Sequence, residues 1–177
     1  MLTSPVEALR QLFLFEEQPN LRPRYNAAPT DELPIVRRSK RGKRELVIAG
    51  WGLIPYWAKD KGIGYRTINA RANSLHIKPA FREAYRKRRC LVLANGFYEW
   101  RKEGKIKQPY LIQLKSGEPF AFAGLWEFWI SPEEEDVRSF TIVATDPNAV
   151  VAPLHTRMPA ILNPIDYDAW LDPSQPI

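Results

Sequence analysis

Glu99 is the residue whose type and setting best suit it to chemistry. It lies between Tyr98 and Trp100, shortly after the apolar run Cys90–Ala94, which we expect to form a buried strand. A carboxylate in such surroundings is partly desolvated, which raises its pKa and suits it to proton transfer near neutral pH. The alternative is that Glu99 points outward in an alternating strand, or pairs with a basic neighbour. This stretch alone favours the alternative, so other segments must decide.

Two other segments carry polar groups that could act on a substrate. His155 stands between apolar residues and Arg157, with prolines fixing the backbone on both sides, although a lone histidine is more often structural than catalytic. Asn69 and Arg71 flank one small residue, so in an extended segment they face the same side. There they could grip a phosphate or a sugar, or equally well satisfy buried backbone groups.

Aromatic and basic residues point to a polyanionic partner. The segment Gly50–Trp57 is rich in glycine, proline and aromatic residues, and its rings could stack on nucleobases or anchor the core. The formal net charge of +6 favours a polyanion, although many basic proteins bind none. The basic segment Arg38–Arg44 is more simply a solvated hairpin turn than a nucleic-acid contact.

Length and composition limit the remaining possibilities. A chain of 177 residues is expected to form one domain, residues 1–177, with a core of its own. The single cysteine excludes an intrachain disulfide framework and a cysteine-based metal cluster, and we expect no metal and no other cofactor. No apolar stretch approaches the roughly 20 residues that span a bilayer, and no signal peptide opens the chain. We therefore expect a cytoplasmic location and no membrane partner.

The elements that must position these residues are mostly strands. Ser4 and Pro5 predict the start of a helix that runs to Phe13, and a second, basic helix is expected over Phe81–Arg89. A short helical stretch should follow the turn at residues 146–148, and an amphipathic helix should lie at residues 164–171. Strands are expected at residues 34–37, 45–51, 90–94, 109–114, 120–126 and 140–144. Their hairpin connections predict an α+β domain with a largely antiparallel, barrel-like sheet.

Five segments, taken in order, resemble the SRAP family, the SOS-response-associated peptidases. They are RYNAAP (24–29), WGLIPYW (51–57), INAR (68–71), NGFYEW (95–100) and PLHTRMP (153–159). Each motif alone is weak, but the series covers nearly the whole chain and is specific. The resemblance implies a monomeric α+β domain whose basic groove binds single-stranded DNA containing abasic sites, acting in the DNA damage response. It also implies a bacterial, nucleoid-associated protein.

The resemblance further implies covalent chemistry at the amino terminus. Family members begin Met-Cys-Gly-Arg-Phe, and autoproteolytic removal of the methionine leaves a cysteine with a free α-amine. That amine forms a Schiff base with the C1′ aldehyde of an abasic site, and the thiolate then closes a stable thiazolidine ring. The product is a DNA–protein crosslink that shields the lesion.

The remaining site residues are carried over by position. The resemblance implies that Asn69 holds the terminal cysteine or the sugar, that Glu99 shuttles protons to and from the amine, and that His155 acts as general acid–base on the deoxyribose oxygen. Five further positions match DNA-binding residues: two phosphate-gripping arginines, a stacking or wedging tryptophan and two residues of the motif that lines the groove, namely Arg71, Arg157, Trp57, Arg24 and Asn26.

The opening residues depart from the family pattern. This chain begins Met1-Leu2-Thr3, so the nucleophilic cysteine and the arginine close to it are absent. Either a few N-terminal residues precede this sequence in the native protein, which we favour, or the protein is a natural variant that binds single-stranded DNA without crosslinking it. In both cases we expect a chain that begins Met1-Leu2 to bind and not to form the thiazolidine.

Two other classes of function compete with this interpretation. A thiol peptidase acting on proteins would need a pair such as Cys90 and His155, but Cys90 is internal and begins a buried strand, where cysteine packs as a small hydrophobe. A non-catalytic basic module that binds RNA or DNA would explain the charge but not Glu99 and His155 together. In such a module, Glu99→Gln and His155→Ala should leave binding unchanged.

Overall fold

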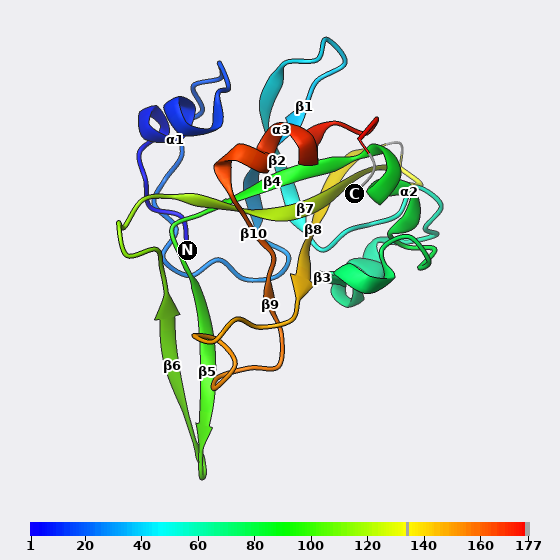
Figure 1. Ribbon diagram of the computed structural model, residues 1–177. Coiled ribbons are helices and arrows are strands. Elements are labelled where there is room, and N and C mark those ends of the chain that lie inside the picture. Colours follow the sequence, from blue (N-terminus) through cyan, green and yellow to red (C-terminus); the bar gives the residue numbers. More distant parts are fainter. Residues whose placement is uncertain (134, 176–177) are drawn as a thin grey trace.

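A closed five-stranded barrel forms the centre of the molecule (Figure 1). The computed structural model describes residues 1–133 and 135–175. Around the barrel the strand order is β7-β4-β1-β2-β8, and pairing of β8 with β7 closes the ring. The barrel strands are β1 (Glu32–Arg38), β2 (Arg44–Trp51), β4 (Arg89–Ala94), β7 (Phe120–Ile130) and β8 (Asp136–Thr145).

Short strands extend the barrel wall, and a separate two-stranded arm leaves it. The short strands are β3 (Asn69–Arg71) and β9 (Met158–Pro159), which pair with β8, and β10 (Ile161–Leu162), which pairs with β7. The arm consists of β5 (Phe97–Glu103) and β6 (Ile106–Ile112), which pair only with each other and project away from the barrel (Figure 1).

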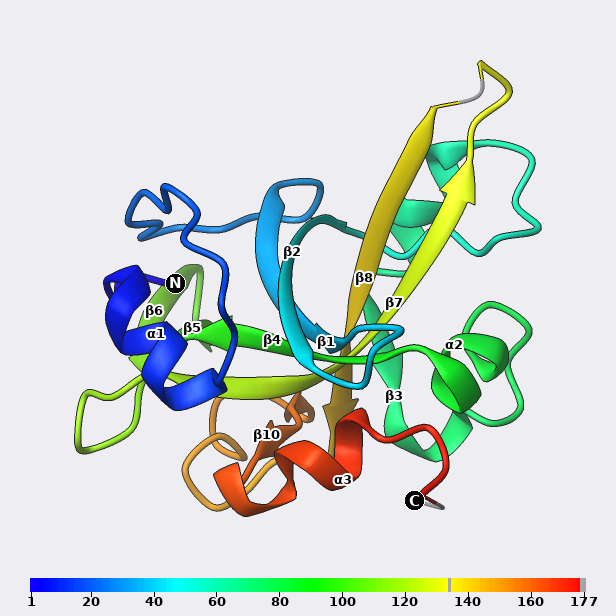
Figure 2. The same cartoon turned by 90° about the horizontal axis from the view of Figure 1, so that it is seen from above.

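Strand alternation divides the apolar side chains into two clusters. Ile35, Val92 and Phe140 belong to the cluster that fills the barrel. Their sequence neighbours, such as Val36 and Leu91, belong to the outer cluster. Residues of the helices pack in this outer cluster, and Figure 2 shows α1 and α3 lying outside the barrel. These helices are α1 (Val6–Phe13), α2 (Arg82–Lys87) and α3 (Tyr167–Leu171), with 3₁₀ turns at Lys61–Arg66, Ala72–Ser74 and Pro164–Asp166.

Most of the expected elements are present, and the predicted α+β barrel is confirmed. Ser4, however, does not cap the first helix. Pro5 occupies the N-cap position, and no side chain makes a capping hydrogen bond there. The Ser4 hydroxyl instead accepts a hydrogen bond from the Asn95 side-chain amide at 2.8 Å. The prediction of a short helical stretch after residues 146–148 is wrong. Turns occupy it, since Asn148 Oδ1 accepts from the backbone N–H groups of Val150 and Val151.

Among residues 1–133 and 135–175, no helix combines the length and the apolar character that crossing a membrane requires.

Candidate active site

A cavity of about 440 Å³ lies where the barrel, the N-terminal segment and the base of the arm meet. Val92, Phe122 and Ile142 contribute apolar side chains from the barrel interior. The polar lining comes from four loops and strands far apart in the sequence, and consists of Asn26, Asn69, Glu99, His155 and Arg157. Five of the eight predicted site residues are therefore gathered around one cavity.

Glu99 lies on β5, at the base of the arm, where pairing places it opposite Tyr110. Its side chain is partly buried, and burial raises the pKa of the carboxyl above its ordinary value. The neighbouring His155 and the backbone N–H of Trp100 favour the ionised form and oppose this shift in pKa, but burial dominates. The desolvation expected from the sequence is therefore observed, and Glu99 is suited to exchange protons.

His155 is oriented by the backbone of the loop that carries it. The N–H of Arg157 lies 3.1 Å from the ring nitrogen Nδ1, and the carbonyl oxygen of Arg157 lies 3.0 Å from the same atom. These contacts occupy Nδ1 in either tautomer and leave Nε2 to exchange a proton with a substrate. The side chain of Arg157 is fixed in turn by Asp146, whose Oδ1 accepts from Nη1 at 2.6 Å.

Asn69 and Arg71 flank a fully buried residue, Ala70, on β3. Both side chains are exposed, which confirms that they face the same side, away from the core. Asn69 lines the cavity, whereas Arg71 lies beside it and does not. An arginine in that position is free to contact a ligand that extends beyond the cavity.

Two further predicted residues lie outside the cavity lining. Arg24 makes an ion pair with Asp31 at 3.0 Å, and its backbone pairs with Leu2. Trp57 does not line the cavity either, and 47% of it is exposed. Both residues are exposed, and the structure does not bring them to the cavity.

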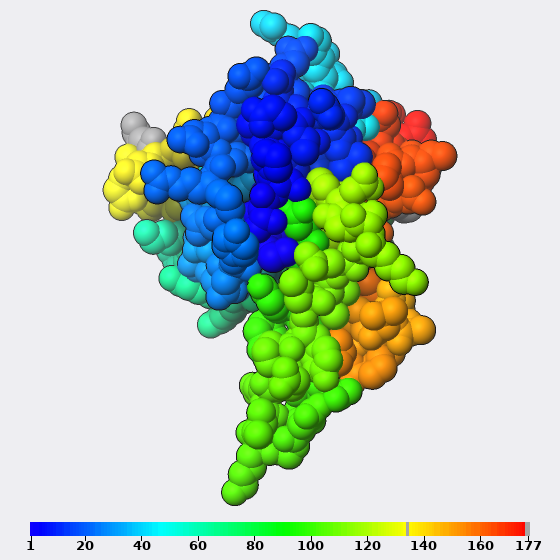
Figure 3. Space-filling view, turned by 90° about the vertical axis from the view of Figure 1, so that its left-hand side faces the viewer, coloured from blue at the N-terminus to red at the C-terminus, as the bar shows by residue number. Residues whose placement is uncertain are grey.

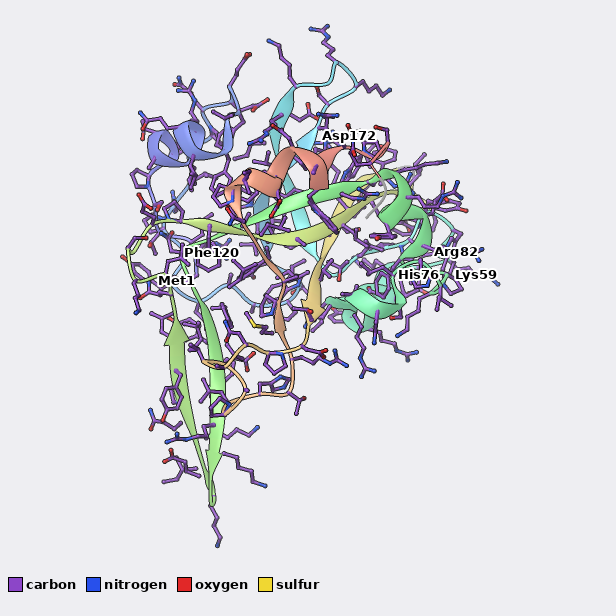
Figure 4. The ribbon with its side chains drawn as sticks, in the orientation of Figure 1. Met1, Lys59, His76, Arg82, Phe120 and Asp172 are labelled. Carbon is purple, nitrogen blue, oxygen red and sulfur yellow. The ribbon has the colours of Figure 1, made fainter. Side chains whose placement is uncertain are left out.

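The N-terminal segment lines the cavity, in keeping with the amino-terminal chemistry that the resemblance implies. The Met1 amino group donates to the Gly96 carbonyl at 3.0 Å, and the Met1 carbonyl accepts from the N–H of Asn95 at 2.9 Å. On its other side, Leu2 exchanges two backbone hydrogen bonds with Arg24, at 2.8 and 2.7 Å. Residues 1 and 2 therefore run as a short strand along the cavity, and Figure 4 shows Met1 at the base of the arm.

Sequence reasoning missed the role of Asn95 in holding the N-terminal segment. Its Oδ1 accepts from the N–H groups of Thr3 at 2.8 Å and Ser4 at 3.0 Å, so one amide anchors the start of the chain. Asn95 is 5% exposed. Its signal was a polar side chain directly after the buried run 90–94. Gly96 is needed beside it, because a Cβ there would lie 2.7 Å from the carbonyl oxygen of Ile112.

Cys90 has the properties of a structural residue. It is fully buried inside the barrel, and burial raises the pKa of its thiol far above the ordinary value. Such a thiol is protonated at neutral pH and does not line the cavity that His155 lines. The geometry therefore gives no support to a Cys90–His155 peptidase pair. In the part of the chain that the structure describes, no group of three or more His, Cys, Asp or Glu residues could hold a metal ion.

The fold and the cavity together describe a barrel protein whose amino-terminal segment leads into a carboxylate–histidine site. Sequence comparison gives the same grouping: the family model for SOS response associated peptidase (SRAP) matches residues 1–176. This chain belongs to the SRAP family.

Relatives and solved structures agree with this assignment. Abasic site processing protein YoqW of Bacillus subtilis is 44% identical over 152 residues, which cover 85% of this chain and 67% of YoqW. Abasic site processing protein HMCES of Gallus gallus is 30% identical over 182 residues, covering 85% of this chain and 54% of HMCES. A crystal structure from Bacteroides thetaiotaomicron superposes with a TM-score of 0.89 at 32% identity, covering 99% of this chain and 81% of that one.

Proposed function

We propose that this protein processes abasic sites in DNA, and that it does so by binding single-stranded DNA and trapping the lesion covalently. The observation that carries the proposal is the cavity that brings Asn69, Glu99 and His155 together with the N-terminal segment. Relatives named as abasic site processing proteins support the substrate class. An abasic deoxyribose has no base, so a cavity of about 440 Å³ is large enough to receive it.

The trapping step requires an amine and a thiol at the end of the N-terminal segment. The amine adds to the C1′ aldehyde and loses water to give an imine, and the thiolate then adds to the imine carbon to close a thiazolidine. Glu99, with its raised pKa, accepts a proton from the ammonium group and returns one as water leaves. His155 delivers a proton to the deoxyribose ring oxygen through Nε2 as the sugar opens, and Asn69 holds the sugar.

DNA-binding roles follow for the residues around the cavity. Arg157 lines it, and Arg71 lies just outside it, so both are placed to contact the phosphates that flank an abasic nucleotide. Asn26 and Arg24 belong to the loop beside the N-terminal segment, on the same rim. Trp57 offers an exposed ring on which a base can stack.

In this proposal a chain that begins Met1-Leu2 binds DNA without crosslinking it, because crosslinking requires an N-terminal cysteine. The peptidase activity is then the removal of the initiator methionine from a form that begins Met-Cys. A thiol protease built on Cys90 is not favoured, since that thiol is buried in the barrel. A purely electrostatic module is not favoured either, since it has no use for a desolvated Glu99 beside His155.

The test compares this chain with a version extended by Cys-Gly-Arg-Phe after the methionine. Each is mixed with uracil-containing single-stranded DNA that has been treated with uracil glycosylase, and the products are separated on denaturing gels. We expect a heat-stable complex from the extended form only. Absence of a complex from both forms, when both are folded, would refute the proposed chemistry and favour the binding module.

A further inference from the structure

The β5–β6 arm is the most exposed part of the molecule and begins at the cavity. It forms a sheet of its own and extends well beyond the barrel, as the green residues in Figure 3 show. Its base contributes Tyr98, Glu99 and Trp100 to the cavity lining, whereas residues 100–109 are all exposed. Any polymer that leaves the cavity on this side therefore meets the arm first.

One face of the arm has its charges satisfied within the hairpin. Arg101 and Glu103 lie on this face together with Glu99, because alternate residues of a strand share a face. Arg101 makes an ion pair with Glu103, and its guanidinium lies 5.2 Å from the centre of the Tyr110 ring. Arg101 and Glu103 therefore need no external partner.

The other face holds two like charges directly opposite each other. Lys102 pairs with Lys107 across the hairpin, and Trp100 pairs with Pro109 on the same face. Like charges in directly opposed positions destabilise an antiparallel pair. Neither lysine makes an ion pair with any of the described residues, and both are exposed. Contacts within the hairpin thus give no reason for this pair of like charges, but a polyanion whose phosphates each contact one of the two ammonium groups does.

We propose that the Lys102–Lys107 pair binds the phosphate backbone of the DNA strand that leaves the cavity. Trp100 lines the cavity and lies on the same face as Lys102, which is two residues further along the strand, or ~7 Å. That distance equals about two nucleotides at the ~3.4 Å rise of stacked DNA. Trp100 is 51% exposed and offers a ring on which a base between the lesion and the lysines can stack. The arm therefore extends the binding site along one flank of the lesion.

This inference rests on the proposed function, and its test separates the two. The probe is a labelled single strand with one tetrahydrofuran abasic analogue, which lacks the aldehyde and so reports binding alone. Each phosphate contact to a single strand contributes about 0.7 to the slope of log K against log salt concentration. Lys102→Gln/Lys107→Gln should therefore lower the slope by about 1.4. Its affinity defect should shrink about sevenfold between 50 and 200 mM salt, as that slope requires.

A matched control removes two charges from the opposite end of the molecule. Lys40 and Arg41 are exposed residues in the turn between β1 and β2, which lies far from the arm in Figure 1. Lys40→Gln/Arg41→Gln changes the net charge by the same amount and should leave the slope within about 0.3 of the wild-type value. A probe with only one nucleotide beyond the abasic analogue, on the flank that runs along the arm, is too short to reach the lysines. With that probe, the wild type and Lys102→Gln/Lys107→Gln should have the same affinity and salt slope.

A single substitution separates binding from folding. Lys102→Glu places opposite charges at the cross-strand position, so the melting temperature should stay equal to that of the wild type or rise, while affinity falls. If the wild type binds the abasic probe but the arm variants keep its affinity and salt slope, the inference about the arm is wrong and the proposed function stands. If the wild type itself does not bind the probe, the proposed function fails first.

Discussion

Replacing Asn95 tests whether one buried amide fixes the N-terminal segment at the cavity. Asn95→Ala removes the acceptor of the Thr3 and Ser4 N–H groups and the donor to the Ser4 hydroxyl, at 2.8, 3.0 and 2.8 Å. A hydrogen bond contributes ~0.5–1.5 kcal/mol net, so three amount to about 3 kcal/mol. For a domain of this size, that corresponds to a fall in melting temperature of about 6–12 °C.

The assay combines thermal unfolding with amide hydrogen exchange. In Asn95→Ala, the Thr3 and Ser4 amides should lose protection, while amides of the barrel strand β4 keep theirs up to the global limit. Asn95→Asp is the matched control, because its carboxylate still accepts from both N–H groups and lies near the start of α1, where negative charge is favourable. It should retain most of the stability.

The reasoning also predicts a functional effect of the same change. In the Cys-Gly-Arg-Phe-extended form, Asn95→Ala should slow crosslinking, because the segment that carries the nucleophile is no longer held along the cavity. The account of Asn95 is refuted if Asn95→Ala melts within 2 °C of the wild type and its Thr3 and Ser4 amides stay protected.

Three further changes test the site and the barrel. Burial raises the pKa of the Glu99 carboxyl in the folded state, so ionisation of Glu99 costs stability as the pH rises above the ordinary pKa of 4.5. Glu99→Gln should therefore melt no lower than the wild type at pH 7. A clearly lower melting temperature would contradict this. Arg88→Met removes the ion-pair partner of the buried Glu127 carboxylate, which lies 2.6 Å from Arg88, and should lower the free energy of unfolding by about 3–5 kcal/mol in a denaturant titration. Adding Glu127→Leu should restore most of that stability, and no recovery would speak against the pairing. Gly124→Ala places a Cβ 2.6 Å from a Val92 methyl inside the barrel and should lower the free energy of unfolding by about 1–3 kcal/mol in the same titration. An unchanged denaturation midpoint would show that the core is more loosely packed than the structure indicates.

The strands of the barrel were predictable because each carries its own local pattern. The run Cys90–Ala94 is apolar throughout and lies in the fully buried β4. The position of Glu99 between two aromatic residues suggested a raised pKa, but that stretch alone favoured an outward-pointing or paired carboxylate, and the burial that raises the pKa became visible only in the structure.

Contacts between distant residues were not predictable in the same way. Closure of the barrel depends on β8, which pairs with β7 antiparallel and with β2 in parallel, and no local periodicity specifies that second pairing. The anchoring of Thr3 by Asn95 joins residues 92 positions apart. The opposition of Lys102 and Lys107 depends on the register of one hairpin.

The central claim is that Glu99 and His155 perform proton transfer for the trapping of an abasic site. The most direct measurement is the single-turnover rate of crosslinking by the Cys-Gly-Arg-Phe-extended chain, with Glu99→Gln and His155→Ala beside it, and with binding to the tetrahydrofuran probe measured in parallel. General acid–base groups contribute about 10²–10⁴-fold, so each variant should crosslink at least 100-fold more slowly while its affinity changes less than about threefold. Crosslinking at the wild-type rate by both variants would contradict the account.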